Sequence, residues 1–358
     1  MSDDSAEEIY AFGGSPFIGG DEYIDIIGGD ENVDIIGGDE NVELGGVELG
    51  GVELGGDELK KIEIISVPEH KIPEIVHEIF NKPTECSFTS GNKDVCSTKE
   101  LTEKMSKFIE EKKGKVVKKP EEVIENMKTL LDCNSESCIY KKKEFVDFAK
   151  LNNVDSVLDE LFKPEGPATN FGLLSNINID EVLEQFVERF AHRKFLHIPF
   201  QMIDFEKRRT LLSTINIAEK LKHQHDTFGV VLNTDVTTGR GIHWFCLFGE
   251  KYKNKSGHTI ISLEYFNSSG KPPMTEVQRW INTKAHELRL RLNLPVKLNY
   301  TNNIYFQNDE HSCGVYALAY IWLRLEGIPP TWFNADNFND EMMHKLRQNL
   351  FSSRGKNE

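Results

Sequence analysis

The segment Cys313–Leu325 most constrains how this chain can fold, because its side chains are apolar on almost every side. As a helix, the sequence CGVYALAYIWLRL leaves no broad polar face for water. Its longest apolar run, residues 315–323, is far too short to span a bilayer. The segment therefore predicts a central helix that other elements of a folded domain cover on most sides.

The sequence around this helix predicts an α+β domain. Apolar segments with strand-like composition occur at residues 228–232, 242–248, 259–266 and 296–301. The second is apolar along nearly its whole length, which indicates a strand buried on both faces. Amphipathic helices are expected at 274–292 and 339–351, and another begins near Asn178. Asn178 and Asn339 are candidate N-caps of their helices.

A helical arm is predicted before this domain. Residues 98–113, 120–131 and 141–151 each have the apolar spacing of a helix. The sequence PEGP at 164–167 marks a break. We therefore place an arm domain at 66–165 and a core domain at 166–358.

Residues 1–65 form a low-complexity tail. DIIGGDENV occurs twice and VELGG three times, and seven Gly-Gly pairs each follow Phe, Ile or Leu. The first 58 residues hold 17 of the 58 Asp and Glu residues and no Lys or Arg. Paired glycines and high charge leave too little apolar surface to offset the loss of backbone entropy, so the tail is predicted to be disordered.

The net charge of −16 belongs almost entirely to this tail, and the rest of the chain is close to neutral. The sequence has no basic block that would indicate nucleic-acid binding. Its acidic N-terminus lacks the basic and apolar regions of a signal peptide. We therefore expect a soluble intracellular protein without nucleic-acid or membrane partners.

The six cysteines are expected to be thiols, because an intracellular compartment is reducing. Four of them lie in the arm: Cys86, Cys96, Cys133 and Cys138. Their spacings do not give the close pairs of zinc modules, so structural thiols are favoured over a metal site. Cys246 is predicted to be a core residue. No metal or cofactor is predicted.

Cys313 is the candidate nucleophile, because it begins the central helix. A thiol at a helix N-terminus lies at the positive end of the helix dipole, which is expected to lower its pKa toward the reactive thiolate. Gly314 is expected to allow a tight turn and close approach of a substrate. The alternative is a small buried apolar residue, which is the commonest role of cysteine.

Three further polar residues fit a catalytic group with Cys313. His243 lies in the second predicted strand, and Asn267 ends the third. If the two strand ends are adjacent, the Asn267 side-chain oxygen can accept a hydrogen bond from Nδ1 of the His243 imidazole. This bond would direct Nε2 of the ring toward the sulfur of Cys313. Gln307, six residues before the cysteine, is a candidate oxyanion donor together with the backbone N–H of Cys313. The alternative for His243 is a structural histidine of the core, and that for Asn267 is a turn residue. The alternative for Gln307 is an exposed residue of a loop.

The ordered set His243-Trp244, Asn267, Gln307 and Cys313-Gly314 resembles the SUMO-specific proteases and the adenovirus maturation protease. In those families the cysteine begins the central helix and the His-Trp pair lies on a strand. They usually carry Asp in place of Asn267 and an acid in place of Ser312. The resemblance implies a cysteine protease core with a central mixed sheet flanked by helices.

A closer resemblance is to the polyprotein-processing cysteine proteases of African swine fever virus and its large-DNA-virus relatives. It extends from about residue 83 to the C-terminus and does not include the tail. It rests on TSGNKDVCS, DCNSESCIYKK, GLLSNINIDE, FGVVLNTDVTTGRGIHW, LEYFNSSG and QNDEHSCGVY. It implies catalytic roles for Cys313, His243, Asn267 and Gln307. It also implies cleavage of structural polyproteins after Gly-Gly-X during virion maturation, in the host cytoplasm and the virion.

The expected mechanism is acyl transfer through a His243–Cys313 imidazolium–thiolate pair and a thioester. Trp244 is expected to cover a narrow tunnel that admits only residues without Cβ, or else to be a core aromatic residue. The apolar-Gly-Gly sites of the tail predict either a tethered substrate or a neutral low-complexity extension. Two other functions remain open at this point. One is the removal of ubiquitin-like proteins from host conjugates, and the other is a non-catalytic virion scaffold on the same fold.

Overall fold

The computed structural model describes residues 67–81, 84–90, 94–167, 171–254, 256–301 and 303–352. They all lie in one compact unit, Gly56–Glu358. The tail predicted at 1–65 lies outside the described residues. None of the helices in the described ranges is long and apolar enough to cross a membrane.

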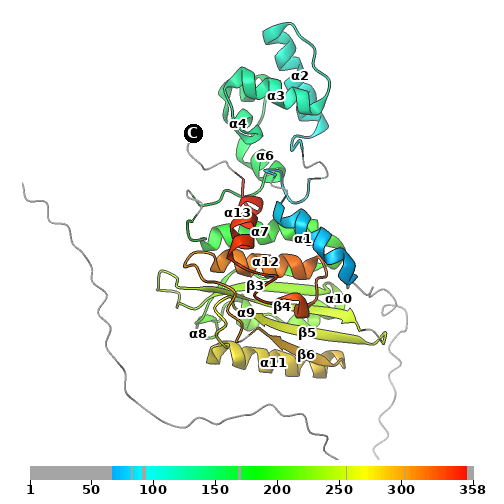
Figure 1. Cartoon of the computed structure of the whole chain (residues 1–358), viewed down its shortest axis with the longest axis vertical. Coiled ribbons are helices and arrows are strands. Elements are labelled where there is room, and N and C mark those ends of the chain that lie inside the picture. Colours follow the sequence, from blue (N-terminus) through cyan, green and yellow to red (C-terminus); the bar gives the residue numbers. More distant parts are fainter. Residues whose placement is uncertain are drawn as a thin grey trace, which may run out of the picture. The chain divides into compact units, whose positions relative to one another are not determined.

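A six-stranded mixed sheet forms the centre of the structure, in the order β1-β3-β4-β5-β6, with β2 also pairing with β3 (Figure 1). The strands are β1 (Phe195–His197), β2 (Gln201–Met202), β3 (Thr227–Asn233), β4 (Trp244–Lys253), β5 (Thr259–Phe266) and β6 (Val296–Tyr300). β4 runs antiparallel to β3 and to β5, whereas β1 and β2 are parallel to β3, and β6 is parallel to β5.

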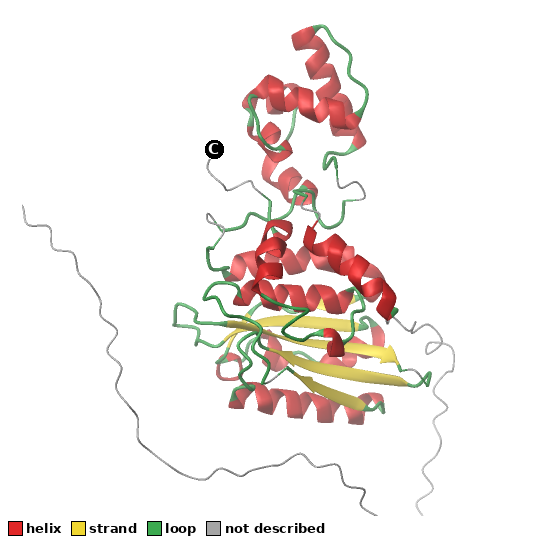
Figure 2. Cartoon of the chain, in the orientation of Figure 1, coloured by secondary structure: helices red, strands yellow, loops and turns green. Residues whose placement is uncertain are grey.

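Helices cover both faces of this sheet (Figure 2). The helices of the core are α1 (Ile72–Asn81), α7 (Asn176–Arg189), α8 (Phe205–Arg208), α9 (Leu211–Thr214), α10 (Ile217–His223), α11 (Thr275–Leu292), α12 (Cys313–Leu325) and α13 (Asp340–Leu350). Short 3-10 turns are η2 (Glu69–Lys71), η3 (Ala191–Arg193) and η4 (Pro330–Trp332). The predicted α+β class with a central mixed sheet flanked by helices is therefore confirmed.

The sequence of β4 explains why both faces are covered. Successive side chains of a strand point to opposite faces. Trp244, Cys246 and Phe248 belong to the apolar cluster that contains α12, α7 and α13. The intervening residues Phe245 and Leu247 belong to a second cluster, which contains α8 to α11. The continuous apolar run in β4 thus supplies both layers of the core.

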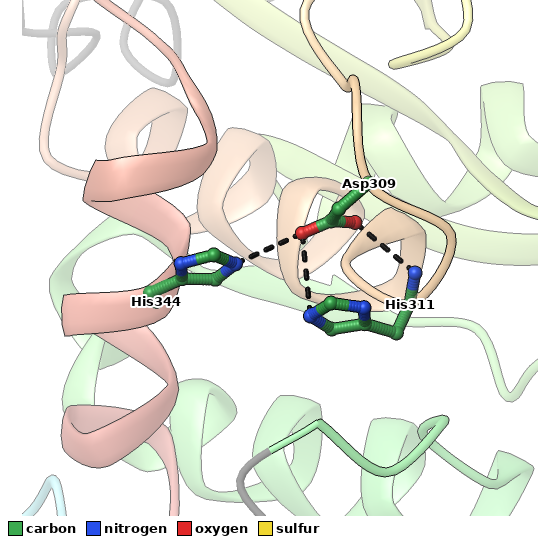
Figure 3. A group of neighbouring side chains, drawn as sticks. All are labelled: Asp309, His311 and His344. Carbon is green, nitrogen blue, oxygen red and sulfur yellow. Dashed lines mark hydrogen bonds and ion pairs between the residues drawn. The ribbon is translucent and has the colours of Figure 1, made fainter.

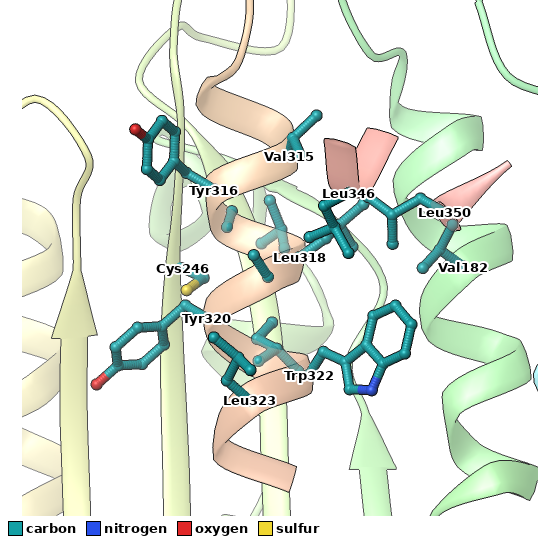
Figure 4. Close-up of a cluster of buried hydrophobic side chains, with 14 of the residues drawn as sticks. Val182, Cys246, Val315, Tyr316, Leu318, Tyr320, Trp322, Leu323, Leu346 and Leu350 are labelled. Carbon is teal, nitrogen blue, oxygen red and sulfur yellow. The ribbon is translucent and has the colours of Figure 1, made fainter. Parts of the chain in front are cut away.

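Helix α12 is buried along its whole length, as its composition predicts. Figure 4 shows side chains of α12 between strand residue Cys246 and the helices on its other side. Val182 of α7 and Leu346 and Leu350 of α13 lie in the same cluster. The helix that carries Cys313 at its first position is therefore held on most sides.

The arm has an apolar core of its own, made of residues between Cys86 and Phe162. Its helices are α2 (Lys99–Lys113), α3 (Pro120–Leu131), α4 (Glu136–Lys141), α5 (Lys143–Ala149) and α6 (Val154–Leu161). Helix α1 lies inside the range predicted for the arm, but its buried residues Ile72, Ile79 and Phe80 join the cluster of α12 and α13 instead. Its amphipathic face is therefore covered by the core domain.

Two arm disulfides, Cys86–Cys96 and Cys133–Cys138, correct the prediction that all six cysteines are thiols. Their Cα–Cα distances of 4.8 and 5.6 Å lie in the range that a disulfide requires. In the second pair, Cys133 directly follows Asp132, which ends α3 in a left-handed conformation. The spacing of the cysteines alone did not reveal these turns. Cys246 is a buried free thiol, as predicted.

Two local predictions also change. Ser175, not Asn178, is the N-cap of α7, and the Asn178 side chain accepts a hydrogen bond from the backbone N–H of Ser175 in a capping box. The strand predicted at 242–248 begins only at Trp244, and Ile242 is exposed. His243 therefore precedes the strand rather than lying within it. Asn339 caps α13 as predicted.

Candidate active site

The structure brings His243 and Asn267 together at one end of the sheet. His243 directly precedes β4, and Asn267 directly follows β5. Because β4 and β5 are antiparallel, the start of one lies beside the end of the other, and Cys246 pairs with Phe266. The two polar side chains meet with His243 Nε2 2.7 Å from Asn267 Oδ1.

The hydrogen bonds of Asn267 determine which ring nitrogen donates. Its Oδ1 also accepts from the backbone N–H and the hydroxyl of Ser269, at 3.0 and 2.8 Å. Its Nδ2 donates to the Tyr265 hydroxyl at 2.9 Å. The oxygen is therefore the atom that faces the ring, so Nε2 must carry the proton and donate it. The basic lone pair of the neutral imidazole is then on Nδ1, the reverse of the predicted arrangement.

The thiol of Cys313 lies next to this pair along the backbone. The backbone N–H of Trp244, the residue that directly follows His243, lowers the pKa of this thiol and therefore lies near the sulfur. The N–H groups of Gly314 and of Cys313 itself also interact with the sulfur. The close packing of α12 against the sheet thus places the nucleophile candidate at the strand end that carries the histidine.

The pKa values of the thiol and the imidazole favour the neutral forms of both. Burial raises the pKa of Cys313, and the N–H groups of Trp244 and Gly314 only partly oppose it. Burial lowers the pKa of His243, while its hydrogen bond to Asn267 acts in the other direction. The predicted lowering of the thiol pKa by the helix N-terminus is therefore wrong for the free protein, because desolvation outweighs it.

The side chain of Gln307 forms hydrogen bonds with Ser268 and Asp309. Its Oε1 accepts from the Ser268 hydroxyl at 2.7 Å. Its Nε2 donates to the backbone oxygen of Asp309 at 2.8 Å and to that residue's Oδ1 at 3.2 Å. Ser268 follows Asn267 in sequence, so the turn after β5 holds both residues. Both hydrogen bonds from the Gln307 amide nitrogen go to Asp309. At least one of them must break if each uses one amide hydrogen and Gln307 is to donate to an oxyanion.

Asp309 organises the loop before Cys313, although its sequence position gave it no predicted role. Its Oδ1 accepts from the backbone N–H groups of His311 and Ser312, at 3.0 and 2.9 Å. Its Oδ2 accepts from the Ser312 hydroxyl at 2.6 Å. Burial alone would raise the pKa of Asp309, but bonds from Ser312, His344 and His311 lower it to about 2. The Asp309 carboxylate thus fixes the backbone of the two residues that precede Cys313.

Trp244 and Gly314 pack against a residue that sequence reasoning did not identify, Leu174. The Trp244 indole is buried and donates from Nε1 to the Leu174 backbone oxygen at 3.0 Å. A Cβ on Gly314 would lie 3.1 Å from Leu174 Cβ and Cδ1. Gly314 has no positive φ, so the reason for glycine is this contact and not a tight turn. The hydrophobic residues around position 174 gave no sign of this proximity in the sequence.

Known proteins resemble this chain in sequence and in fold. No model of a known protein family matches the chain. The cysteine protease of African swine fever virus is 32% identical over 292 residues, which cover 77% of this chain and 98% of the relative. The relative from another isolate, with the same identity and coverage, is named SUMO-1 cysteine protease. The crystal structure of the African swine fever virus protease covers 75% of this chain and 96% of its own, with a TM-score of 0.62 and 30% identity.

The likeness spans nearly the whole length of that viral enzyme and includes both the sequence and the fold. The chain therefore belongs to the family of the African swine fever virus cysteine protease, and it is a SUMO-protease-like viral cysteine protease.

Proposed function

We propose that Cys313, His243 and Asn267 form the catalytic triad of an endopeptidase. The observation that carries this proposal is the 2.7 Å bond between His243 and Asn267, beside a thiol that contacts the amide of Trp244. A base held by a second polar group and adjacent to a nucleophile is the arrangement that covalent catalysis requires. The roles rest on this geometry and on the ordered motif.

The reaction is acyl transfer. Cys313 gives its proton to the imidazole, and the sulfur attacks the carbonyl carbon of the scissile peptide bond. The tetrahedral intermediate collapses to a thioester as His243 protonates the leaving amine. His243 then takes a proton from water, which attacks the thioester, releases the acid and restores the thiol. Gln307 and the backbone N–H of Cys313 stabilise the oxyanion in both steps.

The substrates we propose are structural polyproteins of the virus, cleaved after Gly-Gly-X during virion maturation at assembly sites in the host cytoplasm and in the virion. The packing around Cys313 supports a preference for small residues. Trp244 and Leu174 are joined by a hydrogen bond, and both contact the first turn of α12. A peptide that approaches the sulfur past these two bulky residues is best accommodated where it lacks Cβ atoms.

A second candidate substrate is a ubiquitin-like protein with a Gly-Gly end. Relatives named SUMO-1 cysteine protease favour this possibility. The two candidates differ in what the enzyme must bind, since a conjugate offers a folded surface and a polyprotein site offers an extended peptide. Matched rates on a folded SUMO or ubiquitin fusion and on its isolated C-terminal peptide would argue for peptide recognition.

The decisive experiment compares the wild type with Cys313→Ala on peptides of one sequence. One peptide carries Gly-Gly-X, and its two partners replace the first or the second glycine by alanine. We expect cleavage of the Gly-Gly-X peptide by the wild type alone, with a lower rate when either glycine is replaced. Cleavage by Cys313→Ala would contradict the role of Cys313 as the nucleophile. Equal rates on the three peptides would contradict the proposed Gly-Gly-X specificity.

The same pair of proteins tests the tail as a tethered substrate. The tail carries seven apolar-Gly-Gly sites on the same chain as the enzyme, and a tether raises their local concentration. We propose that the wild type shortens its own N-terminus while Cys313→Ala stays full length. Intact masses of the two proteins after incubation decide this, because equal full-length masses contradict self-cleavage.

A further inference from the structure

Two imidazoles and a carboxylate converge beside the loop that carries Cys313, outside the proposed triad. Figure 3 shows Asp309 and His311 on that loop and His344 on α13. His344 Nε2 lies 2.9 Å and His311 Nε2 3.4 Å from the same Asp309 oxygen, Oδ2. One ligand atom from each residue lies within 4.8 Å of the other two.

These distances suit a small divalent cation. Zinc binds histidine nitrogen and carboxylate oxygen at about 2.0–2.2 Å in a tetrahedron, which separates neighbouring donor atoms by roughly 3.3 Å. Both contacts to Oδ2 are already close to that separation. The two imidazoles are stacked nearly parallel, with ring centroids 5.6 Å apart. The two imidazole nitrogens lie within 4.8 Å of each other, and the half-exposed His344 side chain can move to bring them closer.

The carboxylate is already oriented for such a role. The backbone N–H groups of His311 and Ser312 bind Oδ1, which turns Oδ2 toward the two imidazoles. Carboxylates that bind metals are usually held by hydrogen bonds of this kind.

His311 gives an independent sign of a missing ligand. Its Nε2 atom is buried and has no hydrogen-bond partner among the described residues. The 3.4 Å approach of this atom to Asp309 Oδ2 is therefore not an aligned hydrogen bond. Buried polar atoms are nearly always satisfied, and an orphaned one calls for an unseen ion or water.

The nearby cation Arg347 does not occupy this position. Its guanidinium donates to the backbone oxygen of His311 at 2.9 Å and to that of Gly172. Asp309 Oδ2 thus keeps its two imidazole neighbours. The main competitor of a metal is a proton, which would make one imidazole an imidazolium paired with Asp309.

We propose that Asp309, His311 and His344 bind one zinc-class divalent metal ion through one oxygen and two nitrogens, with water in the fourth position. Such an ion joins the loop before the nucleophile to α13. Asp309 also accepts from Gln307 and Ser312, so the ion fixes the loop that holds the candidate oxyanion donor and the residue before Cys313. Three protein ligands with water in the fourth position give an open site rather than a closed structural site.

The test uses the full chain with Cys313→Ala, so that the reactive thiol cannot bind the metal. Zinc chloride is titrated by calorimetry into this protein and into the same protein with His311→Gln or His344→Gln. The matched control is His223→Gln, which removes a histidine paired with Glu219 four residues away on the surface of α10. Weak binding by the acidic tail is common to all four proteins and cancels in the comparison.

We expect one saturable zinc ion per chain, at least tenfold weaker binding in each cluster variant and unchanged binding in the control. Cobalt chloride should give the visible absorption of a tetrahedral nitrogen–oxygen site in the Cys313→Ala protein, without any further substitution. The proposal is overturned if no saturable binding occurs, or if His311→Gln and His344→Gln bind zinc as tightly as the control. A cluster that binds only a proton predicts one of these two outcomes.

Discussion

Asn267 accepts a hydrogen bond from His243 at 2.7 Å through an amide oxygen, and thus holds the imidazole without a negative charge. A carboxylate in this place would stabilise the imidazolium that forms during catalysis. With an amide, the opposing effect of burial dominates, and the pKa of His243 is lowered. Asn267 therefore orients a neutral His243 imidazole and does not stabilise its protonated form as a carboxylate would.

The first prediction separates positioning from charge at position 267. Asn267→Ala removes the acceptor, so we expect kcat/KM to fall by about 10²-fold or more. Asn267→Asp keeps an acceptor and adds a charge, so it should retain most activity and raise the pKa of His243. Peptide cleavage over a pH series measures both effects.

Ser269→Ala is the control for this pair of variants, because it removes one hydroxyl bond to Asn267 and leaves the ring bond in place. Its kcat/KM should stay within a few-fold of the wild type. Full activity in Asn267→Ala would exclude Asn267 from the catalytic group.

The second prediction concerns the protonation of Cys313. Burial raises the pKa of the thiol and lowers that of His243, so the neutral pair predominates at neutral pH. The thiolate fraction then grows about tenfold for each pH unit until the raised thiol pKa is reached. Alkylation of the free enzyme by iodoacetamide should therefore accelerate steadily from neutral to alkaline pH. A rate that is already constant at mildly acidic pH would mean that a preformed ion pair exists.

The fold and much of the site could be predicted because the decisive residues lie in strongly patterned segments. Helix α12 was predicted with its observed bounds, since an apolar run that begins at a cysteine and ends before Glu326 allows few alternatives. Strand β5 was likewise predicted exactly, with Asn267 directly after it. The meeting of His243 and Asn267 follows from the antiparallel order of two adjacent strands.

The missed features depend on contacts between distant segments. Leu174 lies just before α7, and its proximity to the first turn of α12 is a contact between distant segments that no local pattern encodes. The arm disulfides depend on turns such as that at Asp132, where a non-glycine residue adopts a left-handed conformation. The pKa of Cys313 was misjudged because a sequence shows the helix N-terminus but not the depth of burial.

The third prediction tests Gln307 as an oxyanion donor. Gln307→Ala should lower kcat by roughly 10²–10³-fold with little change in KM, as loss of such a donor does in other enzymes. Because Gln307 also binds Ser268, the variant Ser268→Ala serves as the control for lost loop contacts. Equal losses in the two variants would mean that Gln307 acts by holding the loop and not by stabilising the intermediate.

The fourth prediction tests the packing between the first turn of α12 and Leu174. In Gly314→Ala the new Cβ meets Leu174 Cβ and Cδ1 at 3.1 Å, closer than ordinary contact. We expect a loss of about 1–3 kcal/mol in the free energy of unfolding from overpacking. Activity should fall as well, because Leu174 holds the indole of the residue next to His243.

Leu174→Ala alone should cost about 2–5 kcal/mol through the cavity that it leaves in the core. In the double variant Gly314→Ala with Leu174→Ala, the added methyl group enters part of that cavity, so the two losses should not add. Urea unfolding of the four proteins gives the coupling free energy, which we expect at about 0.5–3 kcal/mol for residues in contact. Strict additivity would contradict a contact between Leu174 and the methyl group added at position 314.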